Sequence, residues 1–382
     1  MAKNGNGEGS IYEHKRNGKK VGYRGSYTIH TAEGPKRRYV TGKTRSEVRQ
    51  KLTKAMADRD GGLFFDAGSL TVGEYVTQWL QGSAKGTVRV STFERYEQIN
   101  RLHIVPALGR MKLKSLTPSH VRNLYRDRLD SGLAPATIHK LHTFLHKAFA
   151  QAVADGLIPR NVTDSLKLPR IDREEIDPLT AEEANRLIEA AEEARDRLSA
   201  LYLLAIHTGL RQGELLALRW EDLDLETGTL RVRRTLTRTK GTYSTGEPKT
   251  KKSRRTVRLT TGAVVALRGH LERQLEEIDR LGSLYRNGGL VFANETGGII
   301  NPSNLRNRSF AKLLRHAGLP PGTRFHDLRH TCATLLLSRN VNPKIVSEML
   351  GHASIAITLD TYSHVLPNMQ ESAVRALQEA LQ

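Results

Sequence analysis

The 382-residue sequence contains a single cysteine, Cys332, and this scarcity excludes two kinds of stabilising site. One thiol cannot form an internal disulfide, and it cannot build a zinc site that needs several thiolates. A chain without disulfides suits a reducing compartment.

Long apolar runs are also missing from the sequence. No stretch approaches the roughly 20 apolar residues that a membrane helix requires, and the N-terminal segment MAKNGNGEGS lacks the apolar core of a signal peptide. We therefore expect a cytoplasmic protein that does not interact with membranes. The sequence shows neither an internal repeat nor a low-complexity tract, which leaves ordinary globular domains.

Basic residues, in contrast, are abundant. Lys and Arg total 60 against 40 Asp and Glu, a formal net charge of +20, which favours binding to a polyanion. Residues 1–60 hold 15 basic and 6 acidic residues, residues 61–170 hold 15 and 8, and residues 171–382 hold 30 and 26. We therefore expect residues 1–170 to make most of the electrostatic contact with the polyanion. A ribosomal or chromatin protein could have the same total charge, but it would rarely have so nearly neutral a C-terminal half.

Residues 1–62 predict a small three-stranded sheet followed by a helix. The runs SIYEHKR, VGYRGSYTIH and KRRYVTG are separated by turn signals, among them Asn17-Gly18. Thr44 and Glu47 then form a capping box that opens the helix. A sheet with this charge suits binding in a DNA groove. A basic domain that serves only solubility is the alternative.

Residues 63–170 predict a compact domain of four or five helices. Its segments have apolar residues at helical spacing, and each segment is closed by Gly or Pro. The last long helix carries His139, His142 and His146 on one face. These histidines could bind a metal, but no carboxylate or cysteine lies among them. A polar face turned to DNA or solvent is the favoured interpretation.

Residues 171–382 predict an α+β domain after the charged, Pro-bounded linker LKLPRIDREEIDPL. The fold class is thus multidomain and mainly α, with small β-sheets. A hairpin is expected from TGTLRVRRTLT and SRRTVRLT, joined by GTYSTGEPKTKK. Helices are expected over residues 180–194, 197–207, from about 211, 261–281, 302–317, 326–338, 342–350, 354–362 and 367–381.

Two segments of this domain place cations near turns. In HTGLRQGELLALRW, Arg211 and Glu214 lie three residues apart on one side of a helix, where the carboxylate can orient the guanidinium. By itself this pair would be interpreted as a surface ion pair. In EPKTKKSRRTVRLT, Lys249 can reach from a tight turn into a cleft. The other basic residues of that run, Lys251, Lys252, Arg254 and Arg255, predict a solvated surface that positions phosphates.

A third segment, RFHDLRHTCATLLL, places His326 and Arg329 three residues apart on a helix whose other face is apolar. His326 and His330 have the spacing of a metal pair, but no third ligand is evident and the segment lacks the HExxH pattern. Contact with a phosphate is therefore favoured over a metal. We interpret His330 as a histidine at the edge of the core whose hydrogen bonds are satisfied.

The fourth segment, EMLGHASIAITLDTYSHV, contains a histidine and a tyrosine. Gly351 allows a sharp turn that presents His352, and Tyr362 lies near the end of a short helix. A tyrosine at such a position is usually a half-buried packing residue.

Together these side chains are the groups that transesterify a phosphodiester without a metal or another cofactor. Two arginines can bind the nonbridging oxygens of the phosphate bidentately. A tyrosine hydroxyl, whose ordinary pKa is about 10, needs positive surroundings or a base to attack at neutral pH. A lysine ammonium can deliver the proton that a leaving 5′-oxygen requires.

In this combination, TGLRQGELLALRW, PKTKKSRRTVRL, HDLRHTCATLL and LGHASIAITLDTYSHV resemble the conserved boxes of the tyrosine recombinases, in particular the phage and transposon integrases. The resemblance spans about residues 178–366 and shows no departure at the catalytic positions. It implies that Arg211 and Arg329 clamp the scissile phosphate and that Glu214 holds Arg211 in place. Lys249 would be the general acid, and His326 would be the proton acceptor or donor that faces the nucleophile. His352 would hydrogen-bond the phosphate, and Tyr362 would be the nucleophile that forms a 3′-phosphotyrosine. Lys251 and Lys252 lie close enough to compete with Lys249 for its role.

The same resemblance, less specific in the N-terminal parts, implies the domain organisation and the partners. Residues 1–62 would bind arm-type DNA sites, residues 63–170 would bind core-type sites, and residues 171–382 would form the catalytic domain. The expected partners are double-stranded DNA, other copies in a homotetramer on DNA, a host DNA-bending factor and an excisionase. The amphipathic tail, with Val374, Leu377 and Leu381 on one stripe, would pack on a neighbouring copy or cover its own domain.

Two other functions remain open at this point. A nicking-closing enzyme similar to type IB topoisomerases would use the same chemistry without exchanging partners, and an arm-binding domain argues against it. A noncatalytic DNA-binding protein with the same fold would be expected to lack at least one of the catalytic groups, and all of them are present.

Overall fold

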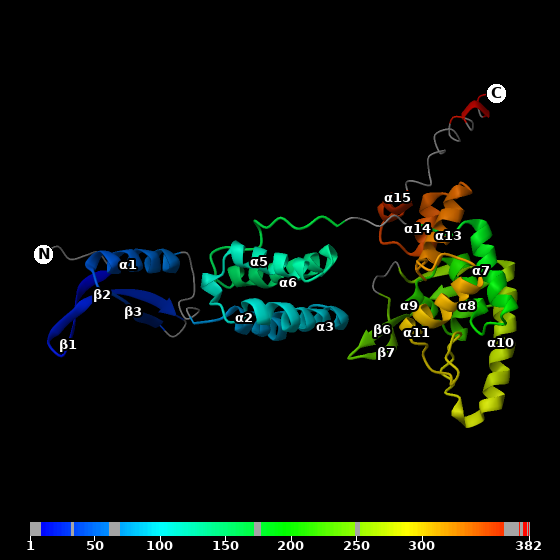
Figure 1. Cartoon of the computed structure of the whole chain (residues 1–382), viewed down its shortest axis with the longest axis horizontal. Helices are drawn as coiled ribbons and strands as arrows, with labels where there is room; N and C mark the ends of the chain where they lie inside the picture. Colours follow the sequence, from blue (N-terminus) through cyan, green and yellow to red (C-terminus); the bar gives the residue numbers. More distant parts are fainter. Residues whose placement is uncertain are drawn as a thin grey trace. The chain divides into compact units, whose positions relative to one another are not determined.

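The computed structural model describes residues 9–31, 34–60, 69–171, 177–248, 253–362, 374, 377–379 and 381. The chain divides into two compact units, Met1–Asp172 and Arg173–Gln382 (Figure 1). The division of the first unit into two domains at residue 62 stays a prediction. Within the described residues, no helix is long and apolar enough to span a bilayer.

The first unit begins with the expected three-stranded sheet. Its strands are β1 (Ser10–Arg16), β2 (Lys19–Thr31) and β3 (Gly34–Gly42), antiparallel in the order β1-β2-β3. Asn17 and Gly18 both have positive φ, 50° and 74°, as the two-residue turn of a hairpin requires.

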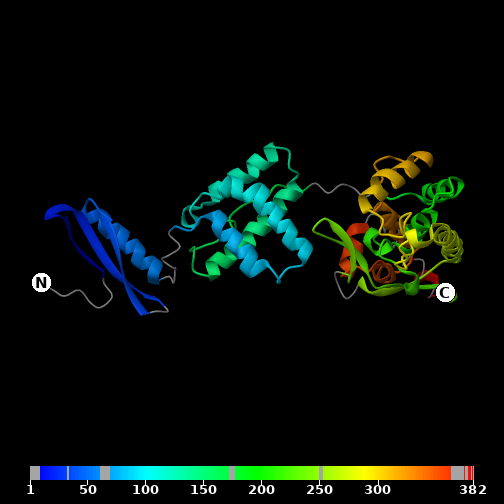
Figure 2. The same cartoon turned by 90° about the horizontal axis from the view of Figure 1, so that it is seen from below.

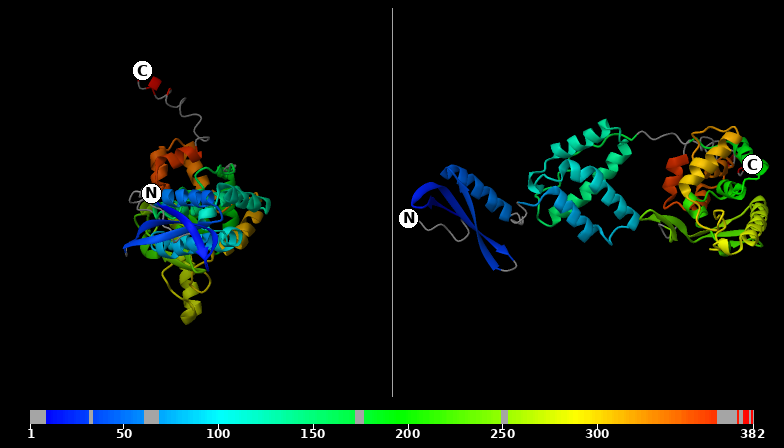
Figure 3. Two further views of the ribbon diagram at one scale, coloured as in Figure 1. Left: turned by 90° about the vertical axis from the view of Figure 1, so that its left-hand side faces the viewer. Right: turned by 60° about the horizontal axis from the view of Figure 1, so that its bottom comes forward.

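Helix α1 (Arg45–Asp60) lies along one face of this sheet (Figure 3). One half of the predicted capping box is present, because the Thr44 hydroxyl accepts a hydrogen bond from the Glu47 amide at 3.1 Å. The Glu47 carboxylate accepts from the Lys43 amide at 2.9 Å, one residue before the expected Thr44 amide. Val48 and Leu52 on α1 are buried against the sheet.

The rest of the first unit is a helical bundle, as predicted (Figure 2). Its helices are α2 (Val72–Trp79), α3 (Val90–Ile99), α4 (Val105–Leu108), α5 (Pro118–Asp130) and α6 (Pro135–Ala154). The core contains an aromatic cluster, in which the Phe144 ring lies 5.8 Å from that of Trp79 and 5.1 Å from that of Tyr96. Large aromatic rings bury much apolar area each, so this cluster is a main source of the bundle's stability.

Each of the three histidines of α6 has a polar partner; His146 is exposed, as expected of a face turned to solvent, and His139 and His142 are partly buried. His139 Nε2 lies 2.8 Å from the Pro169 carbonyl oxygen, and His142 Nδ1 lies 3.2 Å from the Tyr125 hydroxyl. His146 Nε2 lies 3.2 Å from a carboxylate oxygen of Asp164. The segment after α6 therefore folds back and supplies the partners of His139 and His146. The carboxylate of Asp164 could not be inferred from the spacing of the histidines along one helix. Among the described residues, no group of three ligands could hold a metal.

The second unit is built around a buried helix, α8 (Ser199–Thr208), against which α7 (Ala181–Glu193), α10 (Thr261–Leu281) and α13 (Asp327–Ser338) pack (Figure 1). A helix that is apolar on all sides belongs inside a core. The remaining helical segments are α9 (Gln212–Leu215), α11 (Pro302–Asn304), a π-helical turn (Leu305–Phe310), α12 (Ala311–His316), α14 (Pro343–Leu350) and α15 (Ile355–Tyr362).

The β structure of this unit is more divided than the single hairpin that we predicted. One antiparallel sheet contains β4 (Leu223–Asp224), β5 (Thr229–Val232) and β8 (Arg255–Arg258) in the order β4-β5-β8. A separate hairpin joins β6 (Thr235–Thr239) to β7 (Thr242–Gly246). Its turn, Lys240-Gly241, has φ of 49° and 83°, so a lysine occupies a conformation for which sequence rules expect Asn or Asp.

The predicted C-terminal helix over residues 367–381 lies largely outside the described residues. Val374, Leu377 and Leu381 are described, and all three side chains are exposed.

Candidate active site

Helix α13 begins with three of the side chains that the sequence singled out. His326 is its N-cap residue, and Arg329 and His330 follow in the first turn. Arg329 is only 3% exposed, and its Nη1 donates hydrogen bonds to the carbonyl oxygens of Gly209 at 2.7 Å and Leu350 at 2.8 Å. These carbonyls belong to the C-terminal ends of α8 and α14, where helix dipoles concentrate negative charge. Two helix ends therefore fix this guanidinium.

The second terminal nitrogen of Arg329, Nη2, is buried and has no hydrogen-bond partner in the described part of the chain. Burial, followed by the nearby Arg211, lowers the pKa of Arg329 to about 9. A buried, unpaired donor on a cation is costly, and an anion at this point would relieve the cost. The site is therefore prepared for a negatively charged group.

Arg211 lies at the start of α9 and shares the buried carboxylate of Glu214 with Arg255. Arg211 Nη1 lies 2.8 Å from Glu214 Oε1, and Arg255 Nη2 lies 3.0 Å from Glu214 Oε2. Burial acts to raise the pKa of Glu214, but Arg255 and Arg211 outweigh it, so the pKa lies below its ordinary value. Glu214 is thus held ionised between two arginines.

Arg255 is the functional-site residue that the sequence interpretation missed. Its guanidinium is buried, and its Nε donates to the Met349 carbonyl at 2.5 Å, whereas a solvated phosphate-positioning residue was expected. The β-strand register gives the reason, because Arg255 pairs with buried Val232 and so belongs to the core face of β8. The apolar Val257 two residues on is the sequence signal that could have indicated this face.

Gly351, after α14, brings the backbone close to both arginines. Its φ is 67°, and an added Cβ would lie 2.8 Å from Arg255 Nη1. Arg211 Nη2 donates to the Gly351 carbonyl at 3.0 Å. A glycine is required here both by the left-handed conformation and by the close approach of the guanidinium.

His352 follows this turn, as predicted from the glycine. Its Nδ1 lies 2.7 Å from the Thr358 hydroxyl. Burial first, and then Arg329, Arg211 and Arg255, lower the pKa of His352 to about 4. The ring is therefore neutral at physiological pH and suited to hydrogen bonding.

Tyr362 ends α15 and is 1% exposed, more buried than the half-buried packing residue that its sequence position suggested. Its ring packs in a small core with residues of α13 and α14. Its hydroxyl lies 2.8 Å from His330 Nδ1. Burial raises the pKa of Tyr362 to about 12, and Arg329 opposes this rise.

The structure brings all but one of the predicted site residues into one cluster. His326 lies beside His330, with ring centroids 5.0 Å apart, and the charges of Arg329 and Arg211 lower its pKa after burial does. The prediction for Lys249 lies outside the described residues. The hydrogen-bond partner of the Tyr362 hydroxyl is His330, which we had interpreted as a satisfied residue of the core edge.

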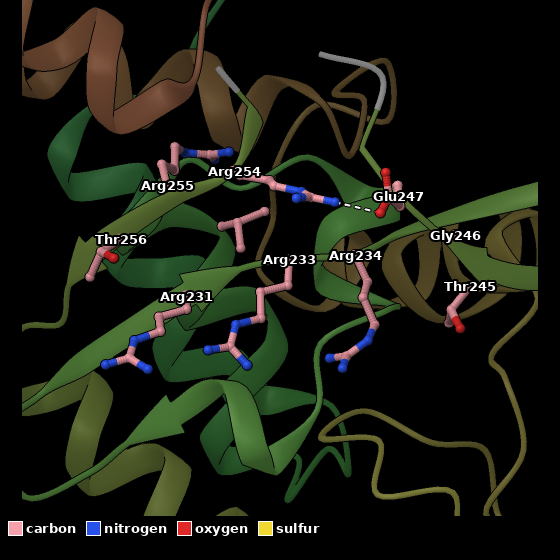
Figure 4. Close-up of a pocket in the computed structure, with 10 residues that line it drawn as sticks. Arg231, Arg233, Arg234, Thr245, Gly246, Glu247, Arg254, Arg255 and Thr256 are labelled. Atoms are coloured by element: carbon pink, nitrogen blue, oxygen red, sulfur yellow. Dashed lines mark ion pairs between the residues drawn. The ribbon is translucent and has the colours of Figure 1, made fainter. Parts of the chain in front are cut away.

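A basic cleft of about 680 Å³ lies on the β structure of the same unit (Figure 4). Arg231 and Arg233 extend to one side of β5, and Arg254 reaches Glu247 at 2.5 Å. All three arginines are exposed. Exposed guanidinium groups in a cleft suit contacts with a phosphate backbone.

Comparison with known proteins identifies the family to which the chain belongs. The family described as "Phage integrase family" matches residues 178–369, and "Phage integrase, N-terminal SAM-like domain" matches residues 71–129. The chain is 37% identical to a protein of Caldanaerobacter subterraneus subsp. tengcongensis named "Tyrosine recombinase XerC-like", over 95% of this chain and 97% of the relative. It is 29% identical to an "Integrase" of Saccharopolyspora erythraea, over 90% of each chain.

Solved structures share the fold. The Tn1549 transposon integrase in complex with a circular intermediate DNA is 24% identical, with a TM-score of 0.68, and the match covers 82% of this chain and 100% of the integrase chain. A lambda integrase tetramer bound to a Holliday junction is 20% identical, with a TM-score of 0.57, over 92% of this chain and 94% of that chain. The chain therefore belongs to the phage integrase family and is a tyrosine site-specific recombinase.

Proposed function

We propose that this recombinase cleaves a DNA strand by attack of the Tyr362 hydroxyl on a backbone phosphate, which leaves a 3′-phosphotyrosine. Reversal of the step by a 5′-hydroxyl of another strand then exchanges partners, and a mobile element is integrated or excised. The observation that carries the proposal is the buried Nη2 of Arg329, which lacks a hydrogen-bond partner among the described residues and lies in a cluster of cations next to a tyrosine.

In this proposal the phosphate is held by two arginines. Arg329 offers its unpaired Nη2, and Arg211 is oriented by Glu214, so both cations are in place before the substrate arrives. Negative charge grows on the nonbridging oxygens as the new bond forms, and donors fixed in advance stabilise this charge without reorganising. Neutral His352 adds a hydrogen bond to the same oxygens.

The proton balance requires one acceptor and one donor. The Tyr362 O–H bond breaks as its oxygen bonds phosphorus, and the bond from phosphorus to the 5′-oxygen breaks. That oxygen must gain a proton, and Lys249 is our candidate donor. The phosphotyrosine ester conserves the energy of the broken bond, so rejoining needs no further energy source.

We propose double-stranded DNA as the substrate, with core-type and arm-type attachment sites. The exposed arginines of the basic cleft support contacts with the DNA backbone, and the fold is shared with integrases that were solved bound to DNA. A homotetramer on DNA, a host DNA-bending factor, an excisionase and a cytoplasmic location complete the proposal. The lambda integrase tetramer on a Holliday junction supports the tetramer.

Covalent trapping on fragments of the native locus tests the proposed function. The wild type, Tyr362→Phe and Tyr285→Phe would be incubated with the fragments and denatured in detergent, and the attached DNA would be sequenced. Tyr285 is a matched control, because it is buried and its hydroxyl accepts a hydrogen bond from Gln274 at 3.0 Å, yet it lies outside the site. Adducts with the wild type and Tyr285→Phe alone would support Tyr362 as nucleophile. Adducts with Tyr362→Phe would contradict it, and binding without any adduct would favour a noncatalytic protein.

A further inference from the structure

The contact between His330 and Tyr362 is the starting point. The Tyr362 hydroxyl lies 2.8 Å from His330 Nδ1, and the ring centroids are 5.7 Å apart. This distance is that of a well-formed hydrogen bond between a phenol and an imidazole. A histidine that directly follows the phosphate-binding Arg329 thus contacts the atom that would attack the phosphate.

Both partners of this hydrogen bond are held in place by the packing around them. The Tyr362 ring is enclosed in a small core with Ala333 and Leu337 of α13 and with Val346 and Leu350 of α14. His330 lies on α13 as well, so one rigid helix positions the tyrosine ring and the partner of its hydroxyl. A nucleophile and a base in hydrogen-bond contact, with the base on a rigid element, form the arrangement that activates a weak nucleophile.

We propose that His330 accepts the proton of the Tyr362 hydroxyl during attack on the phosphate. The inference rests on the proposed function and assigns the proton acceptor of the cleavage step to His330 in place of His326. The phenol O–H donates to Nδ1, which requires that the resting ring carry its proton on Nε2. As the bond from Tyr362 Oη to phosphorus forms, the O–H electron pair stays on oxygen and the proton moves to Nδ1.

The electrostatic setting links this transfer to substrate binding. Burial, and then His326 and the nearby arginines, lower the pKa of His330 to about 4, so the ring is neutral and free to accept. A phosphate held by Arg329 would offset the positive charge around the ring and make Nδ1 more basic. His330 thus becomes an effective base when DNA is in the site. When the strand is rejoined, the same proton returns to the departing tyrosine.

The test separates proton transfer from positioning through two substitutions. His330→Asn keeps an amide oxygen near the position of Nδ1 and can hold the hydroxyl, but it cannot take a proton. His330→Ala removes both functions. The substrate is a nicked duplex that contains the cleavage site recovered by covalent trapping, so that cleavage is irreversible and adduct formation gives a single-turnover rate.

A second reaction controls for damage to the fold. A DNA strand that ends in a 3′-(4-nitrophenyl) phosphate can be joined to a 5′-hydroxyl strand without the tyrosine, because nitrophenolate leaves without needing a proton. This joining still requires DNA binding and the arginine clamp. Tyr362→Phe should join the activated strand but form no adduct, which confirms that the assay bypasses the tyrosine.

We expect both His330 variants to slow adduct formation by about 10²–10⁴-fold, while joining of the activated strand stays within about threefold of wild type. Adduct formation by His330→Asn within threefold of wild type, or faster than wild type, would overturn the inference and leave the proposed function intact. Equal loss in both reactions would also overturn it, since His330 would then support the whole site. If the wild type itself forms no adduct, the proposed function fails and the inference falls with it.

Discussion

Two groups of arginines in the second unit lie in contrasting surroundings. Arg329 and Arg255 are buried and bonded to backbone carbonyls and, for Arg255, to Glu214. Arg231, Arg233 and Arg254 are exposed along the basic cleft. Arginine therefore has a different function in each of the two regions. Where water is excluded, the guanidinium group is held in one geometry and its charge interacts strongly with neighbouring charges. In the cleft, solvent and salt screen the charge of the guanidinium group.

The sharpest test of this contrast compares two carboxylates that each pair with an arginine. The side chain of Glu214 is 2% exposed, and that of Glu247 is 82% exposed. Glu214→Gln would leave the buried guanidinium of Arg255 and the partly exposed guanidinium of Arg211 without their counter-charge. We therefore expect the free energy of unfolding to fall by about 3 kcal/mol. Glu247→Gln should change it by less than about 0.5 kcal/mol. Urea denaturation measures both, and similar losses would show that burial does not separate the two regions.

A conservative substitution in the buried region should affect the rate more than binding. Arg329→Lys keeps the charge but loses the planar fork that reaches two helix ends and the phosphate at once. We expect single-turnover cleavage to slow by about 10²–10³-fold, or about 3–4 kcal/mol, with little change in DNA affinity. Arg233→Lys in the cleft is the matched control. A cleavage rate for Arg329→Lys within a few-fold of wild type would remove Arg329 from the phosphate clamp.

The buried site should also make stability depend on pH. The pKa values of His330 and His352 are lowered to about 4, whereas an unfolded histidine titrates near 6.5. As the pH falls from about 6.5 to about 4, the unfolded chain gains protons that the folded chain does not, so stability falls by up to about 1.4 kcal/mol per histidine and pH unit. His352→Gln should reduce the slope of the unfolding free energy against pH in urea titrations. An unchanged slope would mean that His352 titrates normally.

The smallest effect is expected in the cleft itself. Arg254→Ala should leave stability nearly unchanged and should reduce the slope of log Kd against log salt concentration by about 1, because one phosphate contact is lost. Arg255→Ala should instead lower stability, since it removes a buried partner of Glu214. Measuring DNA binding between low and moderate salt for both variants checks this difference. A salt slope unaffected by Arg254→Ala would place the DNA elsewhere.

The sequence predicted most helices, because caps, turns and apolar spacing are signals that lie within a few residues of each other. The grouping of the catalytic segments rested instead on the chemistry that they share and on their resemblance to the tyrosine recombinases. The cap formed by Thr44 and Glu47 gave the start of α1, and the Gly351 turn indicated where His352 is presented. The β6–β7 hairpin was missed for the opposite reason. Its turn uses a lysine in the left-handed conformation, which local rules do not expect.

The sequence by itself determined the class of the protein, its basic N-terminal half, and Arg211, Glu214, Arg329 and Tyr362 as candidates for its chemistry. Only the tertiary structure decided that Arg255 is buried against Glu214 and that His330 contacts the Tyr362 hydroxyl. These partners lie 41 and 32 residues apart in the chain. Spacing along one element shows which side chains share a face, but the packing of separate elements determines what that face meets.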